Sequence, residues 1–270
     1  MHAIQDDWGI DDVITSEIRH NSYGEGEALT WWLAMLASAS PNSVMIDAGA
    51  YTGLYSLIAA AGRVDVRVIA IEASVVTYGR LCQNILLNKF DTRINANHVA
   101  ISNDAGLVQL SHGYGIFSMS SGESLIPTYE VDHKELVPSM ALDQLLFQDA
   151  ATAVGAIGTK SMPYLPLPPI GGIKIDVEGI EPLLLSGAIK TLSRDKPPLI
   201  IEILSPENLG TCRATLNSLG YEEVAQCEGQ NYIFCGASQK SLLMDTHSKI
   251  ESIETATFSA ESVFSRSFEI

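Results

Sequence analysis

Two periodic patterns of apolar and polar residues alternate along this chain. Short apolar runs, several of which end in an acid, alternate with stretches whose apolar residues recur every three or four positions, which predicts strands alternating with helices. The runs predict strands at 44–48, 66–72, 94–101, 173–177 and 197–203, and the periodic stretches predict helices at 25–40, 54–61, 75–89, 180–192 and 208–219. Two further apolar segments, 221–227 and 231–235, flank a Glu-Gly-Gln turn and predict an antiparallel hairpin.

This alternation also divides the chain. Residues 41–236 are expected to form one α/β domain with a mostly parallel sheet and helices on both faces, preceded by an arm and helix in residues 1–40. The periodicity fails from 113 to 172, where Ser, Gly and Pro are frequent, and we expect a lid over a cleft, with 150–170 partly mobile. The Ser-, Thr- and Glu-rich residues 237–270 predict either a flexible tail or a helix docked on a partner chain.

The first predicted helix contains two neighbouring tryptophans. Trp31 and Trp32 are adjacent in the helix predicted at 25–40, and adjacent positions of a helix point in different directions. We therefore expect one ring to face the core and the other to lie toward a cavity or at a packed surface edge.

Four of the predicted strands end near an acid: Asp47, Glu72, Asp176 and Glu202. Because the carboxyl ends of parallel strands meet at one edge of a sheet, these side chains should share a cleft suited to a cation, an amine or several hydroxyls. Glu72 follows the first strand's glycine turn by about 20 residues, the spacing at which an acid reaches the two hydroxyls of a bound ribose. The alternative for Glu72 is an acid favoured by a helix dipole.

The first strand runs into a turn that contains Gly49 and Gly53. Glycine lets a backbone approach a ligand where a Cβ would clash. The Gly-x3-Gly spacing matches neither the phosphate loop Gly-x4-Gly-Lys-Ser/Thr nor the dinucleotide fingerprint Gly-x-Gly-x-x-Gly, and the turn has no Lys or Arg to meet a phosphate. An ordinary tight strand-to-helix turn is the alternative.

The amino-acid composition reduces the classes of binding partner that we expect. The chain has 16 Lys and Arg against 32 Asp and Glu, a formal net charge of −16, so neither nucleic acid nor an anionic membrane is expected as a partner. No apolar run is long enough for a membrane span, and the N-terminus lacks the features of a signal peptide. The 4 cysteines form no Cys-x-x-Cys pair. We therefore expect a cytoplasmic protein with buried free thiols.

Two stretches carry a resemblance to a known family. Ile46-Asp47-Ala48-Gly49-Ala50-Tyr51-Thr52-Gly53 resembles motif I of the Rossmann-like S-adenosylmethionine (SAM) methyltransferases, and Ile173-Lys174-Ile175-Asp176-Val177-Glu178-Gly179-Ile180-Glu181 resembles the distinctive motif of the FkbM family among them. The resemblance covers roughly residues 44 to 204 and implies a seven-stranded Rossmann-like sheet, SAM as cofactor, and methyl transfer mostly to hydroxyl oxygens of sugars, polyketides and other small metabolites. The chain departs from common family sequences at Ala50-Tyr51-Thr52 and Ile71-Glu72-Ala73 without losing the acids and glycines.

The resemblance and the strand ends together predict the site residues. Asp176, aided by Glu178 or Glu202, is expected to accept a proton from the acceptor hydroxyl or to bind a divalent cation, Mg²⁺, with Asp176 and Glu202 as its ligands. Lys174 lies on the same strand face as Asp176 and is expected to temper the repulsion between the acids. Asp47 is expected either to bind the amino end of SAM through water or to brace the turn. The cofactor contacts are predicted at Asp47, Gly49, Ala50, Tyr51, Gly53, Glu72, Ala73, Ala100, Ser102 and Asp176.

Other functions stay open at this point. The chain could be a SAM-binding or scaffold protein without activity, or a methyltransferase for a peptide or another nitrogen acceptor. An NAD-type dehydrogenase is disfavoured because the third glycine of its fingerprint is missing. The sequence leaves the oligomeric state open, including a homo-oligomer.

Overall fold

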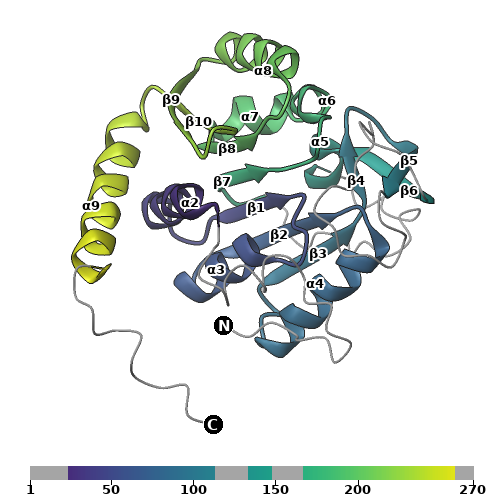
Figure 1. Ribbon diagram of the computed structural model, residues 1–270, viewed down its shortest axis with the longest axis horizontal. Helices are drawn as coiled ribbons and strands as arrows, with labels where there is room; N and C mark the ends of the chain where they lie inside the picture. Colours follow the sequence, from purple (N-terminus) through teal and green to yellow (C-terminus); the bar gives the residue numbers. More distant parts are fainter. Residues whose placement is uncertain (1–23, 113–132, 148–166, 259–270) are drawn as a thin grey trace.

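A seven-stranded sheet forms the centre of the molecule (Figure 1). The computed structural model describes residues 24–112, 133–147 and 167–258. The strands of the sheet, from one edge to the other, are β3 (Ile94–His98), β2 (Arg67–Glu72), β1 (Val44–Ala48), β7 (Ile170–Ile175), β8 (Leu199–Glu202), β10 (Asn231–Gly236) and β9 (Tyr221–Cys227). The strands from β3 to β8 are parallel, and β10 runs antiparallel to both of its neighbours. The predicted Rossmann-like sheet with a terminal antiparallel hairpin is confirmed.

Helices cover both faces of the sheet because the side chains of each strand alternate between faces. In β1, Val44, Ile46 and Ala48 join one core cluster and Met45 joins another. The first cluster packs against α5 (Leu142–Leu146), α6 (Glu181–Ser186), α7 (Ile189–Asp195) and α8 (Pro206–Ser218). The second packs against α2 (Gly26–Ser38), α3 (Leu54–Gly62), α4 (Val75–Leu87) and α9 (Lys240–Phe258). Within the described ranges, none of these helices has the length and apolar character needed to cross a bilayer.

A second, three-stranded sheet replaces part of the predicted single strand at 94–101. That prediction is wrong, because the chain leaves the main sheet after β3. The Val99 N–H donates to the Glu72 carbonyl (3.1 Å), and β4 (Ala100–Ser102) then pairs with β6 (His133–Ala141), which also pairs with β5 (Gly106–His112). The predicted insertion at 113–172 therefore contains regular structure in β6 and α5. Its other parts, 113–132 and 148–166, lie outside the described residues.

Two predicted boundaries also differ from the structure. β7 begins at Ile170 rather than 173. A Cβ at position 172 would come 2.9 Å from the Met45 side chain on the neighbouring strand, and Gly172 can lie in the strand because it has no Cβ. The helix predicted at 180–192 is two helices, α6 and α7, separated at Gly187 and Ala188.

The C-terminal helix α9 packs along α2 of its own chain (Figure 1). The expectation that only one of the two neighbouring tryptophans faces the core is wrong: Trp31 is 4% exposed, Trp32 is 0% exposed, and both belong to the second core cluster. Trp31 stacks on His247 of α9 with the ring centroids 3.7 Å apart, while the Trp32 indole N–H donates to the Tyr55 carbonyl at 3.0 Å. The sequence predicted a flexible tail or a helix docked on a partner chain, whereas α9 packs on its own chain.

Two adjacent leucines of α9 test whether this helix is part of the folded domain. Leu243 is 1% exposed and lies in the second core cluster, whereas Leu242 is 57% exposed. Leu243→Ala should lower the free energy of unfolding by about 2–5 kcal/mol, since it removes buried contacts and leaves a cavity. The matched control Leu242→Ala should change it by less than about 0.5 kcal/mol. Urea denaturation of the two variants measures both values, and equal losses would contradict the docking of α9.

Candidate active site

The turn after β1 lies directly against the carboxyl end of β7. The N–H groups of Gly49 and Ala50 both donate to the Ile71 carbonyl (3.0 and 2.8 Å), and the Asp176 N–H donates to the Ala48 carbonyl (2.9 Å). Gly49 has a φ of +80°, and a Cβ there would lie 1.6 Å from the Asp176 carbonyl oxygen. A residue with a side chain cannot occupy this position unless the two strands move apart.

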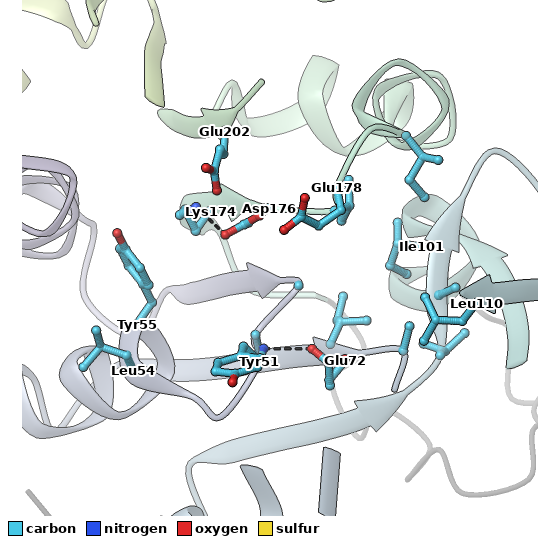
Figure 2. A pocket seen from close by; sticks show the side chains of 18 of the residues that line it. Tyr51, Leu54, Tyr55, Glu72, Ile101, Leu110, Lys174, Asp176, Glu178 and Glu202 are labelled. Carbon is cyan, nitrogen blue, oxygen red and sulfur yellow. Dashed lines mark hydrogen bonds and ion pairs between the residues drawn. The ribbon is translucent and has the colours of Figure 1, made fainter. Parts of the chain in front are cut away.

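Glu72, at the end of β2, holds the same turn through its carboxylate. Its Oε2 accepts the N–H of Tyr51 and its Oε1 accepts the N–H of Ser74, both at 2.8 Å (Figure 2). Tyr51 has a φ of +49°, a left-handed conformation that non-glycine residues rarely adopt. Glu72 is 8% exposed, and the part that remains accessible lines a cavity at this edge of the sheet.

Acidic side chains from the end of β8 and from the segment directly after β7 line the other side of this cavity (Figure 2). Lys174 lies among them: it is 1% exposed, and its Nζ is 3.2 Å from Oδ2 of Asp176. Burial lowers the pKa of the Lys174 ammonium, but the charges of Asp176, Glu25 and Glu202 together outweigh burial and raise it. Lys174 is therefore charged and offsets part of the repulsion between the carboxylates, which agrees with the role predicted for it.

Glu178 and Glu202 lie in surroundings that disfavour a carboxylate charge. Burial, followed by the charges of Asp176 and Glu181, raises the pKa of Glu178 to about 7. Burial, followed by the charge of Asp176, also raises the pKa of Glu202 well above its ordinary range. Glu181, by contrast, accepts the Gly179 N–H (2.6 Å) and the Asn208 side-chain amide (2.9 Å), and it braces the start of α6.

Glu25 belongs to this site, although no pattern in the sequence indicated it. Glu25 precedes α2, and its Oε2 accepts the Tyr55 hydroxyl (2.8 Å). Single carboxylate oxygens of Glu25, Asp176 and Glu202 all lie within 4.8 Å of one another. The start of α2 is itself fixed by Glu228, whose Oε1 accepts the N–H groups of Glu27 (2.6 Å) and Ala28 (3.2 Å). Glu25 reaches the cavity only through this tertiary packing, which local sequence does not encode.

Most of the residues predicted for the site line this one cavity. Asp47, Gly53 and Ser102 are predicted site residues that do not line it. Gly53 caps α3 with a φ of +100°, and the Ser102 hydroxyl donates to Asn103 (3.3 Å). The predicted residues that do line the cavity are Gly49, Ala50, Tyr51, Glu72, Ala73, Ala100, Asp176, Glu178 and Glu202.

Asp47 faces away from the cavity and into the first turn of α3. It is 1% exposed, and its Oδ2 accepts both the N–H (2.9 Å) and the hydroxyl (2.6 Å) of Ser56. Burial raises the pKa of Asp47 to about 6, although the hydrogen bonds from Ser56 and the charge of Lys174 lower it. These contacts favour the second of the two predicted roles, a brace of the turn.

The residues predicted to bind Mg²⁺ fit that ion poorly. Carboxylate oxygens are suitable ligands for a hard cation, and Glu25, Asp176 and Glu202 converge closely enough to share one. The Lys174 ammonium, however, already lies 3.2 Å from Asp176 and would repel a second cation at the same oxygens.

The fold and the cavity together define a Rossmann-like domain with a candidate ligand site at the carboxyl edge of its parallel strands. Residues 47–223 match the family model of the methyltransferase FkbM domain, so the chain belongs to the FkbM methyltransferase family. The resemblance carried by the two motifs is thereby confirmed. Glu25 and α9 lie outside the matched segment.

Solved structures with a similar fold include several methyltransferases. The chain is similar to the methyltransferase FkbM from Methylobacillus flagellatus KT (18% identity, TM-score 0.45, 83% of this chain and 61% of that one). It is also similar to the precorrin-6y C5,15-methyltransferase from Geobacter metallireducens GS-15 (13%, 0.42, 78% and 86%) and to P. horikoshii TYW2 in complex with MeSAdo (16%, 0.37, 78% and 61%). The chain spans 61% of the length of the FkbM structure. No curated protein matches it.

The role of Asp47 can be tested through the pH dependence of stability. The folded protein holds the Asp47 proton more tightly (pKa about 6) than an unperturbed carboxyl does (3.8), so ionisation between these pH values costs folded-state stability. Asp47→Asn keeps an oxygen that can accept the Ser56 N–H and does not titrate. Its stability relative to the natural protein should therefore rise by up to about 3 kcal/mol from pH 4 to pH 6 and stay level above that.

Asp47→Ala is the companion variant in the same denaturation experiment. It leaves both Ser56 donors without this acceptor and should be destabilised by about 1–3 kcal/mol relative to Asp47→Asn. An Asp47→Ala protein with unchanged stability and weakened SAM binding would contradict the bracing role and favour a contact to the amino end of SAM.

Proposed function

We propose that this chain is a SAM-dependent methyltransferase that transfers the methyl group to a hydroxyl oxygen of a small molecule. One observation carries the proposal. A single cavity is lined on one side by the glycine turn with Glu72, and on the other by Asp176, Glu178 and Glu202 (Figure 2). A methyl donor that contains a nucleoside needs both sides of the cavity. One side holds the nucleoside, and the other holds the acceptor beside the methyl group.

Glu72 supports a nucleoside at its side of the cavity. Each of its carboxylate oxygens accepts a backbone N–H, and a carboxylate offers about four acceptor positions in all, enough to accept hydrogen bonds from the two hydroxyls of a ribose as well. Val99, whose N–H donates to the Glu72 carbonyl, adds apolar surface for a base, as do Ile101 and Leu110. The absence of a basic side chain from the turn fits a ligand without phosphates.

The acidic side supports transfer to a hydroxyl. As the acceptor oxygen forms its bond to the methyl carbon, the bond from that carbon to the sulfonium sulfur breaks and the hydroxyl proton passes to a carboxylate. Positioning of the two reactants supplies most of the rate enhancement in such a displacement. Asp176 and Glu178 both line the cavity and are the candidate proton acceptors.

Two measurements on matched variants test this proposal. Calorimetric titration should show that the natural protein binds SAM and that Glu72→Gln weakens binding by about 10- to 100-fold, because the amide has one acceptor oxygen instead of two. A screen of glycosides and polyketides with labelled SAM should then find turnover. Asp176→Asn or Glu178→Gln, whichever removes the proton acceptor, should lower that turnover by about 10²- to 10⁴-fold while SAM still binds.

The exposed Glu207, near the start of α8, supplies the control. Glu207→Gln removes one acid without touching the cavity and should leave both SAM affinity and turnover unchanged. Absence of SAM binding by the natural protein would overturn the proposal. Full turnover in both Asp176→Asn and Glu178→Gln would overturn the assigned chemistry, since neither carboxylate would then be needed.

A further inference from the structure

We propose that the Lys174 ammonium is the resident cation of the acidic side of the cavity, so that methyl transfer needs no divalent metal there. Lys174 is then a positioning residue: it holds the Asp176 carboxylate in place for the acceptor hydroxyl and supplies the opposite charge beside it. The inference rests on the proposed function, because it assigns a residue to the same reaction.

The position of Lys174 in the fold is the first support. It lies on β7 two residues before Asp176, so both side chains point to the same face of the strand. Its side chain is 1% exposed, yet it lines the cavity. The Nζ lies 3.2 Å from Oδ2 of Asp176 and 5.3 Å from the centre of the Tyr55 ring, a cation–π distance. A lysine on a strand that is otherwise apolar is costly to bury unless its charge has a use.

The convergence of three elements on this ammonium is the second support. Glu25 comes from the start of α2, Asp176 from the end of β7 and Glu202 from the end of β8, and their carboxylate oxygens lie within 4.8 Å of one another. The Lys174 Nζ lies 3.2 Å from one of these carboxylates, at Oδ2 of Asp176. A divalent cation would have to use these same oxygens and would meet a fixed positive charge among them.

We therefore expect a divalent metal ion to take the place of the Lys174 ammonium when the ammonium is removed. If Lys174 is shortened, the three carboxylates lose their positive partner but keep their places, because Glu25 is held by Tyr55 and Glu202 accepts from Gln230 (3.1 Å). Oxygen ligands that converge without an ammonium are the usual surroundings of Mg²⁺ or Mn²⁺. The shortened variant should therefore gain metal binding that the natural chain lacks.

Mn²⁺ binding, followed by the electron paramagnetic resonance signal of the free ion, tests this on the full chain without SAM. Lys174→Ala should bind Mn²⁺ at least about tenfold more tightly than the natural protein does. Turnover of the natural protein should be the same with and without chelator. Lys174→Ala should lose about 100-fold or more of the turnover, Lys174→Arg should retain part of it, and Mg²⁺ should restore part of it in Lys174→Ala.

Control measurements separate the outcomes. Lys249→Ala, an exposed lysine of α9, should behave like the natural protein in every assay. Tight Mn²⁺ binding by the natural protein, or loss of its turnover on chelation, would overturn the role of Lys174. So would Lys174→Ala with full turnover. Failure of the natural protein to bind SAM would overturn the proposed function instead, and the Mn²⁺ titration can still be interpreted in that case, because it needs neither SAM nor turnover.

Discussion

The close approach of two backbones, at Gly49 and Asp176, is the constraint on which the rest of the site depends. An ideal Cβ at Gly49 would lie 1.6 Å from the Asp176 carbonyl oxygen, and the Asp176 N–H closes the contact by donating to Ala48 at 2.9 Å. Because the strands can meet this closely, the turn that is suited to a nucleoside and the acids that are suited to an acceptor line the same cavity.

Some of the acids brace the fold, others line the cavity, and Glu72 does both. Asp47 and Glu181 accept hydrogen bonds from neighbouring backbone and side chains and do not line the cavity, which is the ordinary way to stabilise a buried polar group. Asp176, Glu178 and Glu202 line it instead, and a single buried ammonium, Lys174, is shared among the charges there. This excess of negative charge at one edge of the sheet is unfavourable for stability.

Much of what depends on local pattern could be predicted from the sequence. Apolar runs that end near an acid identified four of the five parallel strands, and the order of the strands brought Glu72 and Asp176 to one edge of the sheet. Features that depend on packing between distant segments could not be predicted. Glu25 reaches the cavity because Glu228 fixes the start of α2, and Trp31 is buried because α9 returns to cover it. The break after β3 likewise depends on a partner strand, β6, from the insertion.

A crystal structure of the chain with S-adenosylhomocysteine bound would show directly whether one ligand lies between the two sides of the cavity. We expect both ribose hydroxyls to lie within about 3 Å of the Glu72 carboxylate and the sulfur to face the side of the cavity lined by Asp176 and Glu178. A ligand bound elsewhere, or bound with its sulfur turned away from these acids, would contradict this expectation.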